Sequence, residues 1–363
     1  MRTTRQDRWL SVGCQGVLAG VVLTAVGVGP GTPAASGSAH RADDGSAAVG
    51  MPTGEAVARS RTHERAIEVL LDAAQSPNAE IRANAVEALG ASPSRLALIA
   101  GAALRDDSIG VRAVAAMAVG KAELREFADD VRPLTGDSSP FVQASAIGAL
   151  SMLGESPDPT PLADMLLTAA STRVRAHAAF VLGEMGDRSA VRMLKEAARI
   201  RIPRSTAMEV RLFRLQVAEA LVKLGDDDAL QALRAALYPS RPEELEATAL
   251  AVQILGTIGD RGAINELMLL SERRDEAGGG MPAEIRLAAA ASIAQLGDRS
   301  GWFIAERHWK DASAGVRAQA AIVFGWTRGE RNLQRLEAML EDPDARVRVA
   351  AAAAVVRLAS SPN

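Results

Sequence analysis

Apolar residues recur along this chain at the spacing of helices. Four, seven and eight residues after Val174 stand Ala178, Val181 and Leu182, which share one face of a helix at 100° per residue. The same offsets after Val316 give Ala320, Val323 and Phe324. Each block is therefore predicted to be a helix whose apolar face is buried.

This block occurs about nine times. Each copy starts at an apolar anchor, and Arg follows the anchor in seven of the nine copies, Gln143 and Thr248 being the exceptions. The anchors are Ile81, Val111, Val142, Val174, Phe213, Ala247, Ile285, Val316 and Val347. Their spacings of 30, 31, 32, 39, 34, 38, 31 and 31 residues indicate a solenoid, in which each unit packs on its neighbours.

The units are separated by a recurring turn. Thirteen positions after the anchor comes Asp187, Asp226, Asp260 or Asp298, each preceded by Gly. Gly fits a helix end with positive φ, and Asp can then cap the next helix. A second apolar-periodic helix precedes each anchor, so a unit consists of helix A, a turn and helix B. The prediction is an all-α superhelix of about nine helical hairpins.

The pattern resembles HEAT repeats, specifically the short HEAT-like class named after phycobilisome lyases. The resemblance covers about residues 63–359 and implies a right-handed superhelix with helix B on the concave side. We expect one elongated body over residues 63–363. Repeats three, six and nine depart most from the pattern, and an atypical last repeat would suit a cap.

The N-terminal region predicts export. Arg2, Arg5 and Arg8 precede an apolar stretch at 16–28 and a run of small residues at 33–39. This order is typical of a secretory signal peptide over residues 1–39, and the alternative is an uncleaved membrane anchor. The mature protein would be periplasmic, envelope-bound or extracellular, without Cys14, the only cysteine. Residues 40–62 are rich in Gly, Ala and Ser and are expected to form a flexible linker.

The charge disfavours nucleic acid as a partner. The chain has 41 basic and 44 acidic residues, a net charge of −3. The Arg after each anchor invites a nucleic-acid interpretation, and HEAT-like DNA glycosylases exist. An Asp recurs five residues before the anchor, however, so an Asp–Arg ladder between successive repeats explains both residues. These aspartates are Asp106, Asp137, Asp311 and Asp342.

Candidate binding residues lie three, six and ten positions after the anchor, on the face of helix B that is not core. This face mixes amide, charged and aromatic groups, which suits a protein or peptide partner, although an ordinary solvated helix face has the same appearance. Trp326 is out of pattern for its position, and aromatic side chains are favoured binding anchors. Trp302, by contrast, matches core positions of helix A. The candidates are His177, Phe180, Glu184, Gln216, Glu219, Gln253, Gln319, Ile322 and Trp326.

Signals for catalysis are weak. The four histidines are scattered, and His177, Glu184 and Glu219 form at most a weak metal-site hypothesis. We expect no catalytic residue, metal or cofactor. Two insertions at 200–206 and 275–282 fall at the same kind of connection and are either a second contact site or neutral loop drift. The favoured function is an exported, non-enzymatic scaffold; the alternatives are a chromophore-lyase-type accessory enzyme and a structural spacer.

Overall fold

The computed structural model describes residues 54–274 and 279–360, where the chain forms 18 α-helices in two layers. The inner helices are α3 (Ala79–Leu89), α5 (Ile109–Lys121), α7 (Pro140–Met152), α9 (Thr172–Met185), α11 (Ala207–Lys223), α13 (Leu245–Thr257), α15 (Ala283–Gln295), α17 (Ala314–Thr327) and α19 (Ala345–Ser360). The outer helices are α2 (Gly54–Ala73), α4 (Pro93–Ala103), α6 (Ala128–Val131), α8 (Thr160–Thr168), α10 (Val191–Ala197), α12 (Leu230–Ala235), α14 (Ile264–Glu272), α16 (Trp302–His308) and α18 (Glu330–Met339). Each inner helix contains one of the nine anchors, so the predicted helix-hairpin repeats are confirmed.

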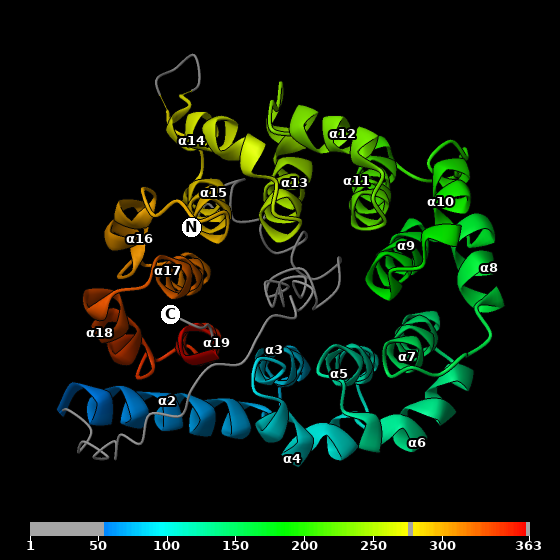
Figure 1. Cartoon of the computed structure of the whole chain (residues 1–363). Coiled ribbons are helices and arrows are strands. Elements are labelled where there is room, and N and C mark those ends of the chain that lie inside the picture. The colour runs from blue at the N-terminus through cyan, green and yellow to red at the C-terminus, as the bar shows by residue number, and fades with distance from the viewer. Residues whose placement is uncertain (1–53, 275–278, 361–363) are drawn as a thin grey trace, which may run out of the picture.

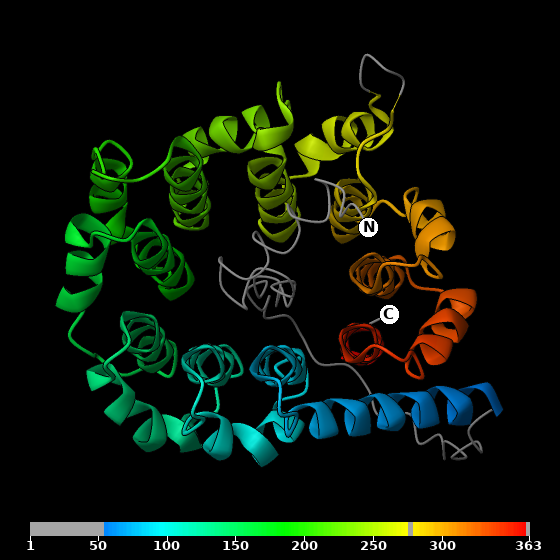
Figure 2. The same cartoon turned by 180° about the vertical axis from the view of Figure 1, so that it is seen from behind.

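The repeats form a closed ring. Figures 1 and 2 show the inner helices end-on around the ring and the outer helices outside them, with α19 beside α2 and α3. Ala66, Ile67 and Leu70 of α2 belong to the same buried core as α19. The predictions of an elongated body and of a terminal cap are therefore wrong: every residue from 349 to 356 is buried, because α19 has neighbours on both sides.

Two exposed ion pairs accompany this closure. Arg59 Nη2 lies 3.0 Å from Glu330 Oε2, and Arg65 Nη2 lies 3.1 Å from Glu341 Oε1. We call the contact of α2 with α18 and α19 the seam. The seam has an apolar core and a charged rim, as the interfaces between consecutive repeats do.

The N-terminal boundary of the solenoid differs from the expected one. Helix α2 begins at Gly54, so residues 54–62, which we expected in the linker, are helical. The remaining linker at 40–53 and the expected signal peptide at 1–39 lie outside the described residues.

Glycine nine positions after the anchor lets inner helices approach closely. A Cβ on Gly120 would lie 2.7 Å from Ala149 Cα of the next inner helix, and one on Gly183 would lie 2.8 Å from Ala220 Cα. No side chain fits at such distances without moving a backbone. The glycine that the repeat shows in α5 and α9 is therefore a packing residue, and it faces an alanine for the same reason.

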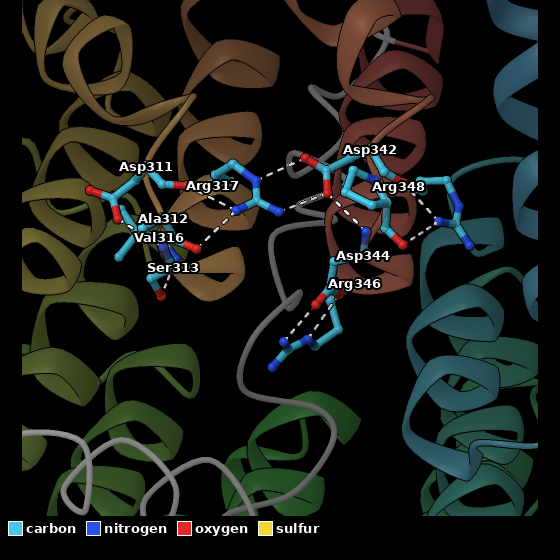
Figure 3. Close-up of polar contacts among 10 residues, drawn as sticks. Asp311, Ala312, Ser313, Val316, Arg317, Asp342, Asp344, Arg346 and Arg348 are labelled. Carbon is cyan, nitrogen blue, oxygen red and sulfur yellow. Dashed lines mark hydrogen bonds and ion pairs between the residues drawn. The ribbon is translucent and has the colours of Figure 1, made fainter. Parts of the chain in front are cut away.

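Three rungs of the predicted Asp–Arg ladder are present. Arg82 contacts Asp106 at 2.7 Å, Arg112 contacts Asp137 at 3.0 Å, and Arg317 contacts Asp342 at 2.8 Å. Figure 3 shows the third rung, in which Arg317 also donates to the Asp311 carbonyl oxygen. Each aspartate of a rung also accepts a backbone N–H at the start of its own inner helix, as the Asp342 carboxylate does from the Asp344 N–H. One rung therefore ties together two repeats and a helix start.

The ladder of Asp–Arg pairs does not continue through every repeat. Asp311 accepts from Ser313 N–H and contacts His308, while Arg286 donates to the Ser271 carbonyl oxygen instead. The expected rung at Asp311 is therefore absent. Arg175 has no aspartate partner in the described part of the chain either: its guanidinium is buried and donates to three carbonyl oxygens, those of Leu166, Leu167 and Ala169.

The predicted Gly–Asp turn is confirmed. Gly186, Gly225, Gly259 and Gly297 all have φ between 74° and 96° and precede the aspartates named above. The Asp187 carboxylate accepts the Ser189 N–H at 2.9 Å, and Asp298 accepts from Ser300 at 2.8 Å. None of the helices in the described part of the chain is long and apolar enough to cross a membrane.

Candidate functional site

The inner layer carries all nine candidate residues, but it exposes them unequally. Three of them are buried, namely His177, Gln216 and Glu219. The other six are half-buried: Phe180, Glu184, Gln253, Gln319, Ile322 and Trp326. Only this second group has surface to offer to a partner in the structure as it stands.

Phe180 and Glu184 lie at the centre of a charged cluster from three inner helices. Lys121 Nζ of α5 is 3.0 Å from Glu184 Oε2, and Lys223 Nζ of α11 is 2.5 Å from Glu184 Oε1. The two ammonium groups also lie over the Phe180 ring, at 5.2 and 5.4 Å from its centroid. Lys121 reaches Glu184 past helix α7. Only on the concave side do alternate helices of a curved solenoid converge, so this cluster faces the inside of the ring.

The cluster is electrostatically compensated. Burial by itself raises the pKa of Glu184, but the charges of Lys121 and Lys223 outweigh it and lower the pKa to about 2. Burial likewise lowers the pKa of Lys223, and the carboxylates of Glu219 and Glu184 outweigh it and raise the pKa. Glu219 accepts a hydrogen bond from Gln216 as well. The four charges hold one another and the Phe180 ring in place, as a fully satisfied network does.

His177 is held in place by neighbouring residues of the inner layer. Its Nε2 is 3.0 Å from both Ser145 Oγ and the Phe141 carbonyl oxygen, and its ring stacks at 6.1 Å from Phe180. Burial lowers its pKa to about 4, so the imidazole is neutral at pH 7. The weak metal-site hypothesis fails here, because Glu184 and Glu219 bind lysine and no group of three metal-ligating side chains occurs among residues 54–274 and 279–360.

A second group of candidates on the inner layer lies along α17 and consists of Gln319, Ile322 and Trp326. The Trp326 ring lies 4.7 Å from the Arg357 guanidinium carbon of α19, a cation–π contact. Its indole Nε1 and the Gln319 Oε1 are shielded from solvent and have no hydrogen-bond partner among residues 54–274 and 279–360. Such groups normally find a partner when they are buried. Gln253 of α13 contributes a further amide, outside both groups.

The inner layer also holds charged residues that the candidate set missed. Lys121, Lys223 and Arg357 stand ten positions after their anchors, the same register position as Glu184 and Trp326. Glu87 stands six positions after its anchor, and burial raises its pKa to about 8. The register was the signal that could have included all four.

Two aromatic residues of α16 are exposed, and one of them, Trp302, was misassigned. Trp302 and Phe303 are 40% and 39% exposed, so the expectation that Trp302 is core is wrong. Arg331 of α18 lies 5.9 Å from the Trp302 ring and Arg307 lies 5.4 Å from the Phe303 ring. Phe324, in contrast, is fully buried as predicted.

Comparisons with known proteins agree with the architecture. HEAT repeats are matched over residues 97–170, 159–252 and 273–357, more than half of the chain. No curated protein matches the sequence.

Solved structures of low sequence identity are similar to this chain over much of its length. The complex of CpcE and CpcF of phycocyanin lyase from Nostoc sp. PCC7120 is 17% identical, with 78% of this chain and 98% of that chain covered and a TM-score of 0.39. Human deoxyhypusine hydroxylase is 18% identical, with 75% and 99% covered and a TM-score of 0.35. A Kap121p mutant is 14% identical, with 84% and 38% covered and a TM-score of 0.31.

Proposed function

The chain belongs to the HEAT repeat family, and on this premise we propose that it is a non-enzymatic scaffold that binds a protein or peptide through the inner layer of its ring. The observation that carries the proposal is Trp326. It is a half-buried aromatic ring at a register position where the other repeats hold Ala, Met, Thr, Gln, Glu, Lys or Arg. Aromatic side chains with exposed surface are common anchors of protein interfaces.

The charges of the inner layer support a peptide rather than a highly charged ligand. At the positions three, six and ten residues after the anchors, Lys121, Lys223 and Arg357 are matched in number by Glu87, Glu184 and Glu219. With no excess of either sign, the layer offers amides and aromatic or aliphatic surface to a partner. Gln253, Gln319 and Ile322 are the residues that would contact it beside Trp326 and Phe180.

We further propose that this scaffold works outside the cytoplasm. The order of basic, apolar and small residues over 1–39 supports a secretory signal peptide, and its removal would also remove Cys14. N-terminal sequencing of the mature protein tests this: a chain that begins near residue 40 supports cleavage, and a retained Met1 contradicts it.

The binding proposal is tested by substituting Trp326. Purified wild-type chain and Trp326→Ala are immobilised, exposed to the envelope fraction of the source cells, and the retained proteins are quantified by mass spectrometry. A partner retained by the wild type should be depleted at least about tenfold with Trp326→Ala, as expected for an interface hot spot. Its thermal unfolding midpoint should stay close to that of the wild type.

A matched control is Trp302→Ala, which removes the same side chain from the outer layer. It should retain the partner as the wild type does. Equal retention by Trp326→Ala, or a large loss of its stability, would contradict the proposal and make Trp326 a core residue.

A further inference from the structure

One repeat of this acidic protein is strongly basic. Residues 188–225 contain nine Arg or Lys and three Asp or Glu, whereas the whole chain has a net charge of −3. Most of these cations precede α11, in α10 and the connection that follows it. The excess therefore gathers on the outer layer of a single repeat.

Four of these cations lie on one side of the α10 segment. Arg192 and Lys195 are in α10, Arg188 is in the 3-10 turn before it, and Arg199 follows its end. All four are exposed and line one open groove, together with Ser189, Val191, Glu196 and Ile200. We call the four cations the α10 stripe. At 1.5 Å per residue the row is ~17 Å long.

The arginines of the stripe lack the partners that the ladder arginines have. Lys195 Nζ pairs with Asp226 at 2.6 Å. The guanidinium groups of Arg188, Arg192 and Arg199, however, form no ion pair or hydrogen bond with any residue of 54–274 and 279–360. Uncompensated like charges in one row repel one another, and an anionic partner removes this repulsion.

The insertion at 200–206 extends the basic surface. Arg201 and Arg204 are exposed, while Ile202 between them is buried and anchors the segment. Its end is fixed by Thr206 and Glu209, which cap α11 reciprocally. The two extra cations are thus held beside the stripe by packing and by a helix cap.

We propose that the α10 stripe binds an acidic segment of a partner protein, with Val191 and Ile200 contacting apolar side chains of that segment. Carboxylates border the stripe, since Asp187 precedes Arg188 and the acidic turn Asp226–Asp228 is joined to Lys195. A duplex or a bilayer would press its phosphates against these carboxylates, whereas a single acidic helix fits between them. This surface is separate from the inner layer and does not depend on the function proposed for it.

The probe for this proposal is a fluorescein-labelled, helix-forming peptide of about 12 residues, rich in Glu and Leu, which matches the ~17 Å row. Its binding to the full chain is followed by fluorescence anisotropy. The same peptide with Lys in place of Glu, a duplex DNA of similar length and phosphatidylserine vesicles are measured alongside. We expect binding of the acidic peptide alone, weakened by added salt because exposed charges are screened.

The variants separate the stripe from general charge. The triple variant Arg188→Ala, Arg192→Ala and Arg199→Ala should lose about tenfold in affinity, while Arg→Lys at the same positions should lose less. Its matched control is Arg261→Ala, Arg299→Ala and Arg307→Ala, which removes three exposed arginines elsewhere, two of them at the register position of Arg188. The control and Trp326→Ala should both bind like the wild type.

Three results would overturn the proposal. One is equal affinity of the stripe variant and the wild type for the acidic peptide. Another is an equal loss in the control variant. The third is binding of DNA or vesicles that depends on the stripe as strongly as peptide binding does. Loss of peptide binding in Trp326→Ala would instead assign the peptide to the inner layer.

Discussion

The arginines of the repeat framework and those of the α10 stripe are the same residue in opposite surroundings. Three framework arginines, Arg82, Arg112 and Arg317, are shielded from solvent. Each contacts an aspartate of the next repeat and donates to a backbone carbonyl oxygen of its own repeat. Arg188 and Arg192 are exposed and contact no anion among the described residues. The first set stands directly after the anchor. Arg188 shares its register position with Arg261 and Arg299, but the full row of Arg188, Arg192, Lys195 and Arg199 occurs in one repeat only.

This difference shows how a solenoid divides structure from recognition. A side chain that every repeat needs is held by contacts which every repeat supplies, such as the helix-start carbonyls and the aspartate of the ladder. A side chain that one repeat alone carries has no such contacts. Its charge remains available to a partner, and removing it should leave the fold unchanged. The predictions below test whether burial and pairing separate the two sets.

Among the charged side chains, the largest loss is expected from Arg175→Ala. Arg175 is 5% exposed, and it donates at 2.6 to 3.0 Å to three carbonyl oxygens at the end of α8 and after it. The variant leaves these shielded carbonyl oxygens without a hydrogen-bond donor, so we expect a loss of about 4 kcal/mol in the free energy of unfolding. Urea unfolding followed by circular dichroism measures it.

Arg173→Ala is the matched control, because Arg173 is exposed and lies two residues earlier on the same helix. Its unfolding free energy should stay within about 0.5 kcal/mol of the wild type. If both variants lost the same amount, burial would not distinguish the framework arginines, and the comparison would fail.

In the inner layer, Glu184→Gln should cause a smaller loss of unfolding free energy, and this loss should depend on pH. Lys121 and Lys223 lower the pKa of Glu184 to about 2 against burial, whereas an unfolded glutamate titrates near about 4.3. The ionised group therefore contributes stability that is complete above about pH 5 and is lost as the pH falls toward 2. At pH 7, Glu184→Gln should lower the unfolding free energy by up to about 3 kcal/mol.

The diagnostic quantity is the difference in unfolding free energy between the wild type and Glu184→Gln. It should shrink as the pH is lowered from 5 to 3, because the unfolded wild type then binds a proton at Glu184 that the folded protein does not. Contributions of Glu87 and His177 are common to both proteins and cancel. Glu243→Gln, at an exposed site in the connection from α12 to α13, is the matched control, and its unfolding free energy at pH 7 should stay within about 0.5 kcal/mol of the wild type. A constant difference for Glu184→Gln would mean that the carboxylate is not held ionised by the lysines.

The sequence predicts what the repeat specifies. The anchor, the Gly–Asp turn and the Asp–Arg pair recur, and each corresponds to a local contact within a repeat or with the next one. Phe324 was predicted as core by register alone and is buried. Periodicity and turn chemistry are sufficient here, because a solenoid is built from neighbour contacts.

Features that join distant repeats were not predictable in this way. Closure depends on the curvature summed over nine hairpins, so no single copy contains a signal for the contact of α19 with α2. The contact of Lys121 with Glu184 skips a repeat, and it exists because the ring is concave. Trp302 illustrates the opposite error: its register suggested core, but its side chain lies outside against Arg331.

The smallest effect is expected at the seam, where pairing occurs without burial. Arg59 and Glu330 are 59% and 51% exposed although they lie 3.0 Å apart. Exposed pairs of this kind contribute little, so Arg59→Ala should lower the unfolding free energy by less than about 0.5 kcal/mol. Leu70→Ala, which removes a fully buried side chain from the same helix, should cost about 2–5 kcal/mol. Urea unfolding of both variants compares rim with core. A loss for Arg59→Ala as large as that for Leu70→Ala would show that pairing alone, without burial, holds the ring closed.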